Sequence, residues 1–73
     1  MNLSEYDLCE SCRNVKLRNG QTIGEYIKNC NADGTFNDEM RSRITCMALF
    51  GQLNNYGGCS KCIAKMKEVA KIP

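Results

Sequence analysis

The sequence predicts a small, mainly α-helical domain that is stapled by its cysteines. We expect three to four short helices, and residues 14–23 are a candidate for one short β-hairpin. The chain has 73 residues, the size of a single small domain (1–73), whose core is marginal without a staple. Six cysteines are candidates for that staple. Helix-start signals and apolar residues at helical spacing recur along the chain.

Two helix-start signals mark the first half of the chain. Ser4-Glu5-Tyr6-Asp7 resembles a capping box and is expected to begin a short helix that carries residues 8–12. Thr22-Ile23-Gly24-Glu25 is a second box and opens a helix to about residue 30. Between them, Asn19-Gly20 indicates a hairpin turn. The same residues could instead extend the first helix and end it at the glycine; we favour the hairpin.

The second half of the chain predicts two further helices. A long helix is expected at about residues 38–53, and Asn54–Gly58 breaks it. Its apolar residues recur at spacings of three and four: Met40, Ile44, Met47, Phe50 and Leu53. This stripe is expected to be buried, with Arg41 and Arg43 exposed. The last helix is expected from Cys59 to about Ile72, with the apolar face listed here: Cys59, Cys62 or Ile63, Met66, and Val69 or Ala70.

The composition argues against catalysis. The chain has no histidine, which excludes His-based acid–base chemistry and His-containing zinc sites. It has no phosphate-binding loop, nucleophile elbow or paired-carboxylate signature. We therefore expect that the protein is not an enzyme.

Charge and hydropathy constrain the partners and the compartment. The net charge of +2 is small for a protein that depends on phosphate contacts. No stretch approaches the roughly 18 apolar residues of a membrane span, and the first residues lack the apolar run of a signal peptide. If Met1 is the native start, we expect a cytoplasmic protein. If Met1 was added for expression, the chain could be a mature secreted domain.

Two C-x-x-C motifs at opposite ends of the chain are the main chemical signal. They supply Cys9 and Cys12 at one end and Cys59 and Cys62 at the other. Two residues between thiolates let both sulfurs reach one ion, and two such pairs provide the four sulfurs of a tetrahedral zinc site. The second pair follows two glycines and begins a helix, whose N-terminus favours the thiolate. The sequence therefore predicts zinc as the cofactor.

The residues around these motifs resemble a known zinc module. Leu8-Cys9-Glu10-Ser11-Cys12-Arg13-Asn14 is similar to the zinc knuckle of the DksA/TraR family of transcription regulators, and the segment from Cys59 to Glu68 resembles that family's second half-site. The resemblance covers under a third of the chain, and 46 residues separate the two motifs, more than in that family's compact finger.

The alternative interpretation is a disulfide framework without a cofactor. An even number of cysteines in a short chain permits three disulfides. A nested pattern would join Cys9 with Cys62, Cys12 with Cys59, and Cys30 with Cys46. Saposin-like proteins resemble this chain in their nested pairing around four or five helices. The chain would then be a secreted, disulfide-knit helical protein, such as a toxin, inhibitor, signal or membrane-active peptide.

The remaining candidate contacts are basic, and they complete the functional hypothesis. Four residues are candidates for anion or partner contacts: Arg13, Arg18, Lys61 and Lys65. Three acids close to the first cysteine pair, Glu5, Asp7 and Glu10, work against phosphate binding. We expect a non-enzymatic, zinc-stabilised interaction module, a small regulator that docks on a protein or nucleic-acid machine. A protein is the favoured partner and nucleic acid the second; the oligomeric state stays open.

Overall fold

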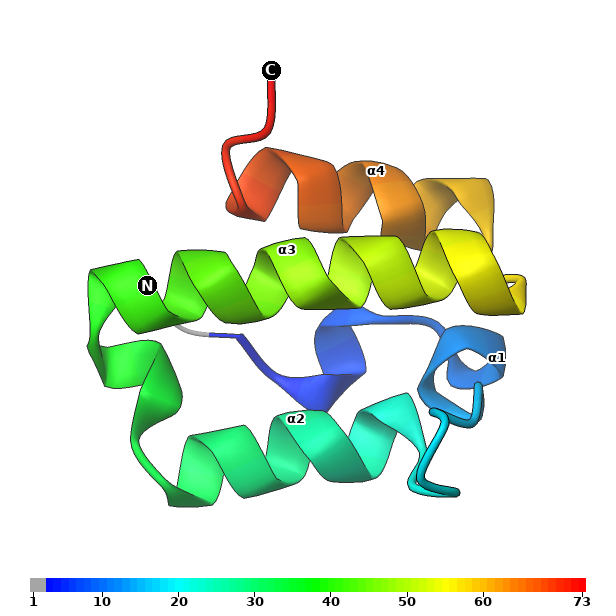
Figure 1. Cartoon of the computed structure of the whole chain (residues 1–73), viewed down its shortest axis with the longest axis horizontal. Helices are drawn as coiled ribbons and strands as arrows, with labels where there is room; N and C mark the ends of the chain where they lie inside the picture. The colour runs from blue at the N-terminus through cyan, green and yellow to red at the C-terminus, as the bar shows by residue number, and fades with distance from the viewer. Residues whose placement is uncertain (1–2) are drawn as a thin grey trace.

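Four α-helices and two 3-10 turns form the fold in the computed structural model, which describes residues 3–73 (Figure 1). In chain order the elements are η1 (Glu5–Asp7), α1 (Glu10–Arg13), α2 (Ile23–Ala32), η2 (Thr35–Asn37), α3 (Glu39–Tyr56) and α4 (Ser60–Val69). The described residues contain no strand. The predicted mainly α-helical class is therefore confirmed.

The three longer helices run back and forth across the molecule. Figure 1 shows α3 between α2 and α4, with α4 antiparallel to α3 and packed along it. The blue N-terminal segment crosses between α2 and α3, and α2 contacts η1, α1 and η2. The segment from Leu3 to Cys9 thus brings Cys9 to the start of α4, where its N–H meets the Cys62 sulfur.

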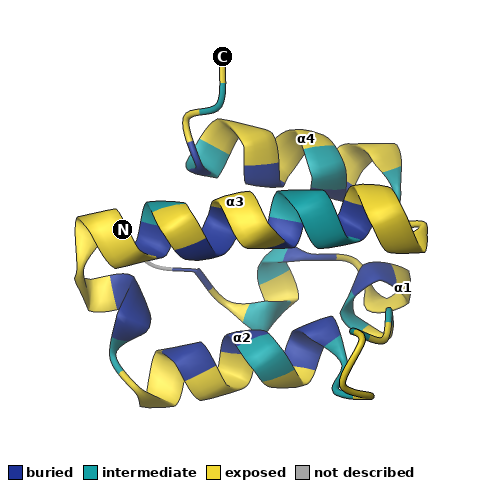
Figure 2. Ribbon diagram, viewed as in Figure 1, coloured by how far each residue is buried: buried dark blue, intermediate teal, exposed yellow. Residues whose placement is uncertain are grey.

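Apolar side chains from every part of the chain form one core. Leu3 and Leu8 are the buried side chains of the N-terminal segment. The helices and η2 contribute Cys12, Ile23, Ile27, Cys30, Phe36, Cys46, Leu49, Leu53, Cys62, Met66 and Ala70. Figure 2 shows the buried positions of α2, α3 and α4 on the sides of these helices that face their neighbours. No helix within the described residues has the length and hydropathy needed to cross a membrane.

The two capping boxes form, but the first begins a shorter element than expected. At η1, the Ser4 side chain accepts a backbone N–H, and the Asp7 carboxylate accepts the Ser4 N–H at 2.7 Å. The expected helix through residues 8–12 is wrong, because Leu8 is extended and turns into the core before α1 begins. Thr22 caps α2 as predicted by accepting the Glu25 N–H at 3.2 Å.

Residues 15–23 form a hairpin-like turn instead of an extension of the first helix. The Leu17 N–H donates to the Gln21 carbonyl at 2.7 Å, and the Ile23 N–H donates to the Val15 carbonyl at 2.9 Å. Gly20 takes a left-handed conformation with φ of 87°. The pairing amounts to one isolated bridge, because α2 starts at Ile23 and leaves the second arm too short for a strand.

The expected orientation of the long helix is wrong, and of the expected stripe only Leu53 is fully buried. Met40, Ile44 and Met47 are 72%, 59% and 46% exposed, and Phe50 is only partly buried. The buried positions of α3 are instead Ser42, Thr45, Cys46, Leu49 and Leu53, which form a second stripe at helical spacing. The two arginines differ as well, since Arg41 is exposed but Arg43 is half-buried.

Small side chains explain this choice of face. Ser42 is fully buried, and its hydroxyl donates to the Thr35 carbonyl at 3.3 Å, which joins α3 to η2. Small side chains at 42, 45 and 46 allow a close approach of neighbouring elements that longer residues would prevent. The buried hydroxyl has a partner, so its burial is tolerated.

Two glycines redirect the chain from α3 to α4. Gly57 ends α3 in the left-handed conformation with φ of 88°. A Cβ built at Gly58 would lie 2.5 Å from Leu53 Cδ2 and 2.7 Å from its Cβ, so this position has no room for a side chain. Cys59 follows directly and begins α4. On α4 the expected apolar face is confirmed, since Cys62, Met66 and Ala70 are buried.

Candidate metal centre

Each C-x-x-C motif lies at the start of a helix. Cys9 and Cys59 are the N-cap residues of α1 and α4, and the second cysteine of each pair lies in the first helical turn. At this spacing the two side chains of a pair lie on the same side of the helix start. The local sequence therefore determines how each pair presents its sulfurs, and the tertiary fold brings the two pairs together.

The four cysteines converge as the sequence predicted. The sulfurs of Cys9, Cys12, Cys59 and Cys62 all lie within 4.8 Å of one another. The Cys9 and Cys59 sulfurs are 3.7 Å apart. Zinc bonded tetrahedrally to thiolates at about 2.3 Å separates its sulfur ligands by roughly 3.8 Å. The donor set and the spacing fit one metal ion held by Cys9, Cys12, Cys59 and Cys62.

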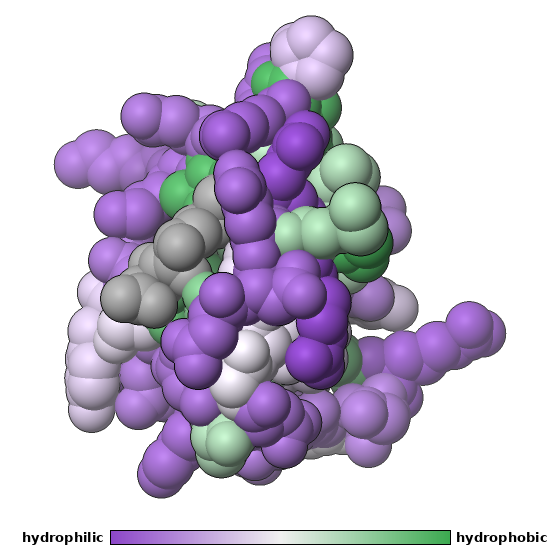
Figure 3. Space-filling model, turned by 90° about the vertical axis from the view of Figure 1, so that its left-hand side faces the viewer, coloured by the Kyte–Doolittle hydropathy of each residue, from purple (hydrophilic) through white to green (hydrophobic). Residues whose placement is uncertain are grey.

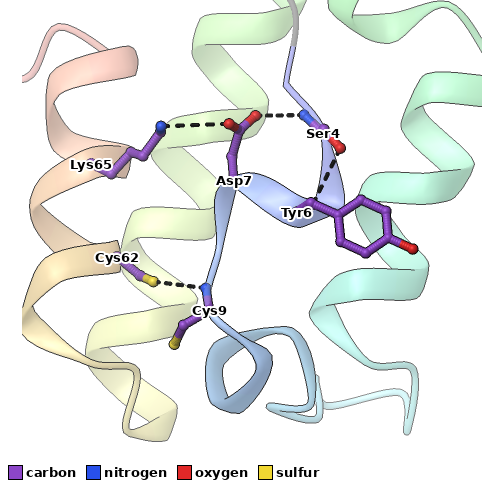
Figure 4. Close-up of polar contacts among 6 residues, drawn as sticks. All are labelled: Ser4, Tyr6, Asp7, Cys9, Cys62 and Lys65. Atoms are coloured by element: carbon purple, nitrogen blue, oxygen red, sulfur yellow. Dashed lines mark hydrogen bonds and ion pairs between the residues drawn. The ribbon is translucent and has the colours of Figure 1, made fainter.

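Backbone N–H groups point at the sulfurs. The Cys9 N–H donates to the Cys62 sulfur at 3.3 Å (Figure 4). The Cys59 N–H donates to the Cys12 sulfur at 3.2 Å, and the Cys62 N–H donates to the Cys59 sulfur at 3.4 Å. Such donors stabilise negative charge on sulfur, as metal-bound thiolates require. The backbone of each helix start thus supports the ligands of the other pair.

The four thiols differ in acidity because their surroundings differ. Burial raises the pKa of the Cys12 thiol to about 12 and also raises the pKa of Cys62. The N–H of Cys62 and the neighbouring sulfurs lower the pKa of Cys59 to about 6. Without a cation, the cluster favours ionisation of Cys59 but opposes it at the two buried thiols. A divalent ion would compensate the charge of further thiolates.

None of the six cysteines forms a disulfide, so the disulfide framework considered above is not observed. The two pairs that this framework would join, Cys9 with Cys62 and Cys12 with Cys59, are free thiols. The third bridge of that alternative is also absent, since Cys30 and Cys46 are buried free thiols. Cys30 lies beside Tyr26 and Thr35, and burial raises the pKa of both thiols. Both side chains belong to the apolar core.

Two of the predicted basic residues, Arg13 and Lys65, contact residues of η1. The Lys65 ammonium pairs with the Asp7 carboxylate at 3.5 Å (Figure 4). The Arg13 guanidinium lies over the Tyr6 ring, 4.9 Å from its centroid. The turn that carries Arg18 adjoins the start of α2, on the side of the molecule away from α4 (Figure 1).

The outer face of α4 keeps a small basic area. Lys61 is exposed and lines a shallow hollow together with Lys65, Lys71 and Glu68. Lys71 also pairs with Glu39 at 3.5 Å. Acids therefore accompany most of the lysines of this face.

Sequence reasoning missed two contributions to the site. Asp7 was expected to disfavour anions, but it also links η1 to α4 through Lys65, next to the metal ligands. Gly58 was treated only as a helix breaker, although its lack of a side chain lets the chain pass Leu53 on its way to Cys59. The Gly57-Gly58 pair directly before a cysteine was the available signal.

No protein-family model, curated protein or solved structure matches this chain. The geometry of the site is therefore the guide to its function.

Proposed function

We propose that Cys9, Cys12, Cys59 and Cys62 bind one zinc ion, and that the domain is a non-enzymatic, zinc-stabilised interaction module. The convergence of four sulfurs within 4.8 Å carries this proposal. Four thiolates in a tetrahedral arrangement are the donor set that zinc prefers in structural sites. An iron–sulfur cluster bonds its cysteines to different iron atoms, whereas this spacing suits a single ion.

The metal's role is to close the chain. It would join a segment that begins at Cys9 to a helix that begins at Cys59, across 50 positions of sequence. In a domain of this size such a cross-link contributes folding free energy directly. Four protein ligands leave no open coordination position for a substrate, which supports a structural role over a catalytic one.

The surface favours a protein partner over nucleic acid. Lys65 and Lys71 are engaged by Asp7 and Glu39, and the net charge of the chain is +2. Binding to nucleic acid depends on unpaired Lys and Arg side chains, which neutralise phosphates and release the counterions condensed on them. We propose a small regulator that docks on another protein in a reducing compartment such as the cytoplasm, where thiolates persist as metal ligands.

Native mass spectrometry of protein produced with both zinc and iron in the medium tests the metal site. We expect one zinc per chain, lost on chelation together with a fall in the melting temperature. Cys12→Ala should abolish zinc retention. Cys46→Ala is the matched control, because Cys46 is equally buried but lies outside the cluster.

Three outcomes would count against the proposal. Iron in place of zinc would overturn the assignment of the metal. Equal zinc retention by Cys12→Ala and Cys46→Ala would overturn the assignment of the site. A melting temperature that chelation leaves unchanged would overturn the structural role.

A further inference from the structure

The outward face of α3 is apolar but has no partner within residues 3–73. Met40, Ile44 and Met47 are the large exposed side chains of this face, and Gly51 continues their line one turn further on. A shallow hollow beside them is lined by Asp38, Glu39, Met40, Arg43, Ile44 and Met47. In Figure 3 a group of hydrophobic side chains lies on the right-hand side of a largely hydrophilic surface, with smaller hydrophobic spots elsewhere. Exposed apolar groups at helical spacing indicate a helix-binding face.

The charged residues of α3 are concentrated at one end of the helix. Its acidic and basic residues all lie at its start, between Glu39 and Arg43. From Ile44 to Gly58 the chain has no charged residue. This half itself presents no charged side chain to desolvate.

We propose that a second copy of this chain covers this face, with the two α3 helices packed antiparallel about a two-fold axis. The stripe is spaced by four, three and four residues, and this order reads the same in both directions. In an antiparallel pair, Ile44 of one copy therefore meets Met47 of the other, and Met40 meets Gly51. A two-fold interface requires this kind of self-complementarity.

Side-chain size and charge favour the same arrangement. A Cβ built at Gly51 meets no atom within 4 Å, so this position offers space for the Met40 side chain of the other copy. Antiparallel packing keeps the charged starts of the two helices at opposite ends of the contact. Parallel packing would instead bring the two Asp38–Glu39 segments together, which is repulsive. The contact involves one helix from each copy, so we expect a transient dimer below the size of a stable interface.

Sedimentation equilibrium of the zinc-loaded full chain, from about 5 μM to about 1 mM, tests this inference. The weight-average mass of the wild type should rise toward twice the chain mass. Ile44→Lys and Met47→Glu should each abolish that rise. Both side chains are exposed in the single chain, so each variant should keep its zinc and its melting temperature. Lys67→Glu, on the exposed side of α4, is the control and should associate like the wild type.

Mixing the variants tests the orientation. Because Ile44 faces Met47 of the other copy, an equimolar mixture of Ile44→Lys and Met47→Glu should regain dimers through a new charge pair. A mixture of Ile44→Lys and Ile44→Glu should stay monomeric. Dimers in the second mixture but not in the first would overturn the antiparallel arrangement.

Two further results would overturn the second copy as the occupant. One is a wild type that stays monomeric at about 1 mM, which would leave the face to a different partner. The other is association that Ile44→Lys does not weaken. Neither result bears on the zinc site, because zinc content is measured in the same samples.

Discussion

Cys9 and Cys59 occupy equivalent positions in the site, although they are 50 positions apart in sequence. Each is the N-cap of a helix, and each backbone N–H donates to the second cysteine of the opposite pair. Neither helix start can shift without breaking a hydrogen bond to the other pair's sulfur. The backbone therefore holds the four sulfurs close together, and the proposed metal completes an arrangement that is already organised.

The face of α3 that supports the core can be tested by truncation. Leu49 is buried, so Leu49→Ala should lower the free energy of unfolding by about 2–5 kcal/mol. Ile44 is exposed, so Ile44→Ala should change it by less than about 0.5 kcal/mol. Urea unfolding at low protein concentration measures both values. A larger loss for Ile44→Ala than for Leu49→Ala would show that α3 is rotated relative to this structure.

The passage between α3 and α4 should not tolerate a side chain at Gly58. Gly58→Ala forces the new Cβ against Leu53 and should cost about 1–3 kcal/mol, with weaker zinc retention because Cys59 is displaced. Gly51→Ala is the matched control within α3, where an added Cβ meets no atom within 4 Å. Thermal melting and zinc content should therefore be unaffected or improved in Gly51→Ala. Equal effects of the two substitutions would contradict the close approach.

Zinc affinity should depend on pH in two regimes. Cys59 has a pKa of about 6. Metal binding therefore displaces a proton from this thiol only below about pH 6, where the thiol is still protonated. The slope of the logarithm of the zinc affinity against pH should therefore fall by about one above pH 6, because binding then releases one proton fewer. The affinity should keep rising into the alkaline range, because the pKa values of Cys12 and Cys62 are raised.

Competition with a chelator from pH 5 to pH 9 measures this slope, after correction for the chelator's own protonation. Cys46→Ala lies outside the cluster and should show the same change of slope. A constant slope through pH 6 would mean that Cys59 is not ionised ahead of metal binding.

Asp7 should matter more for stability than Lys65. Lys65→Ala removes one surface ion pair and should change the free energy of unfolding by less than about 0.5 kcal/mol. Asp7→Ala also removes the acceptor for the Ser4 N–H and should cost about 1 kcal/mol. Chemical denaturation of both variants gives the comparison. Equal losses would indicate that the capping bond contributes nothing to folding.

Local sequence signals predicted the features that depend on only a few neighbouring residues. The Thr22 box, the Asn19-Gly20 turn and the glycines before Cys59 determine where helices begin and where the chain reverses. The two C-x-x-C motifs predicted a cluster of four sulfurs, because each pair is organised by its own helix start. The helix starts, the turn and the presentation of each cysteine pair need no knowledge of what packs against them, whereas the tertiary fold brings the two pairs together.

Only the tertiary structure decided which face of α3 is buried. The helix carries two stripes at the same spacing, one through Ile44 and Met47 and one through Ser42, Cys46 and Leu49. Hydrophobicity favours the first stripe, whereas close packing against η2 and α4 requires the smaller side chains of the second. The Thr35 carbonyl offers the Ser42 hydroxyl a partner, and that contact exists only once η2 lies against α3. Periodicity alone could not predict which of the two stripes is buried, because the choice depends on contacts with atoms of other elements.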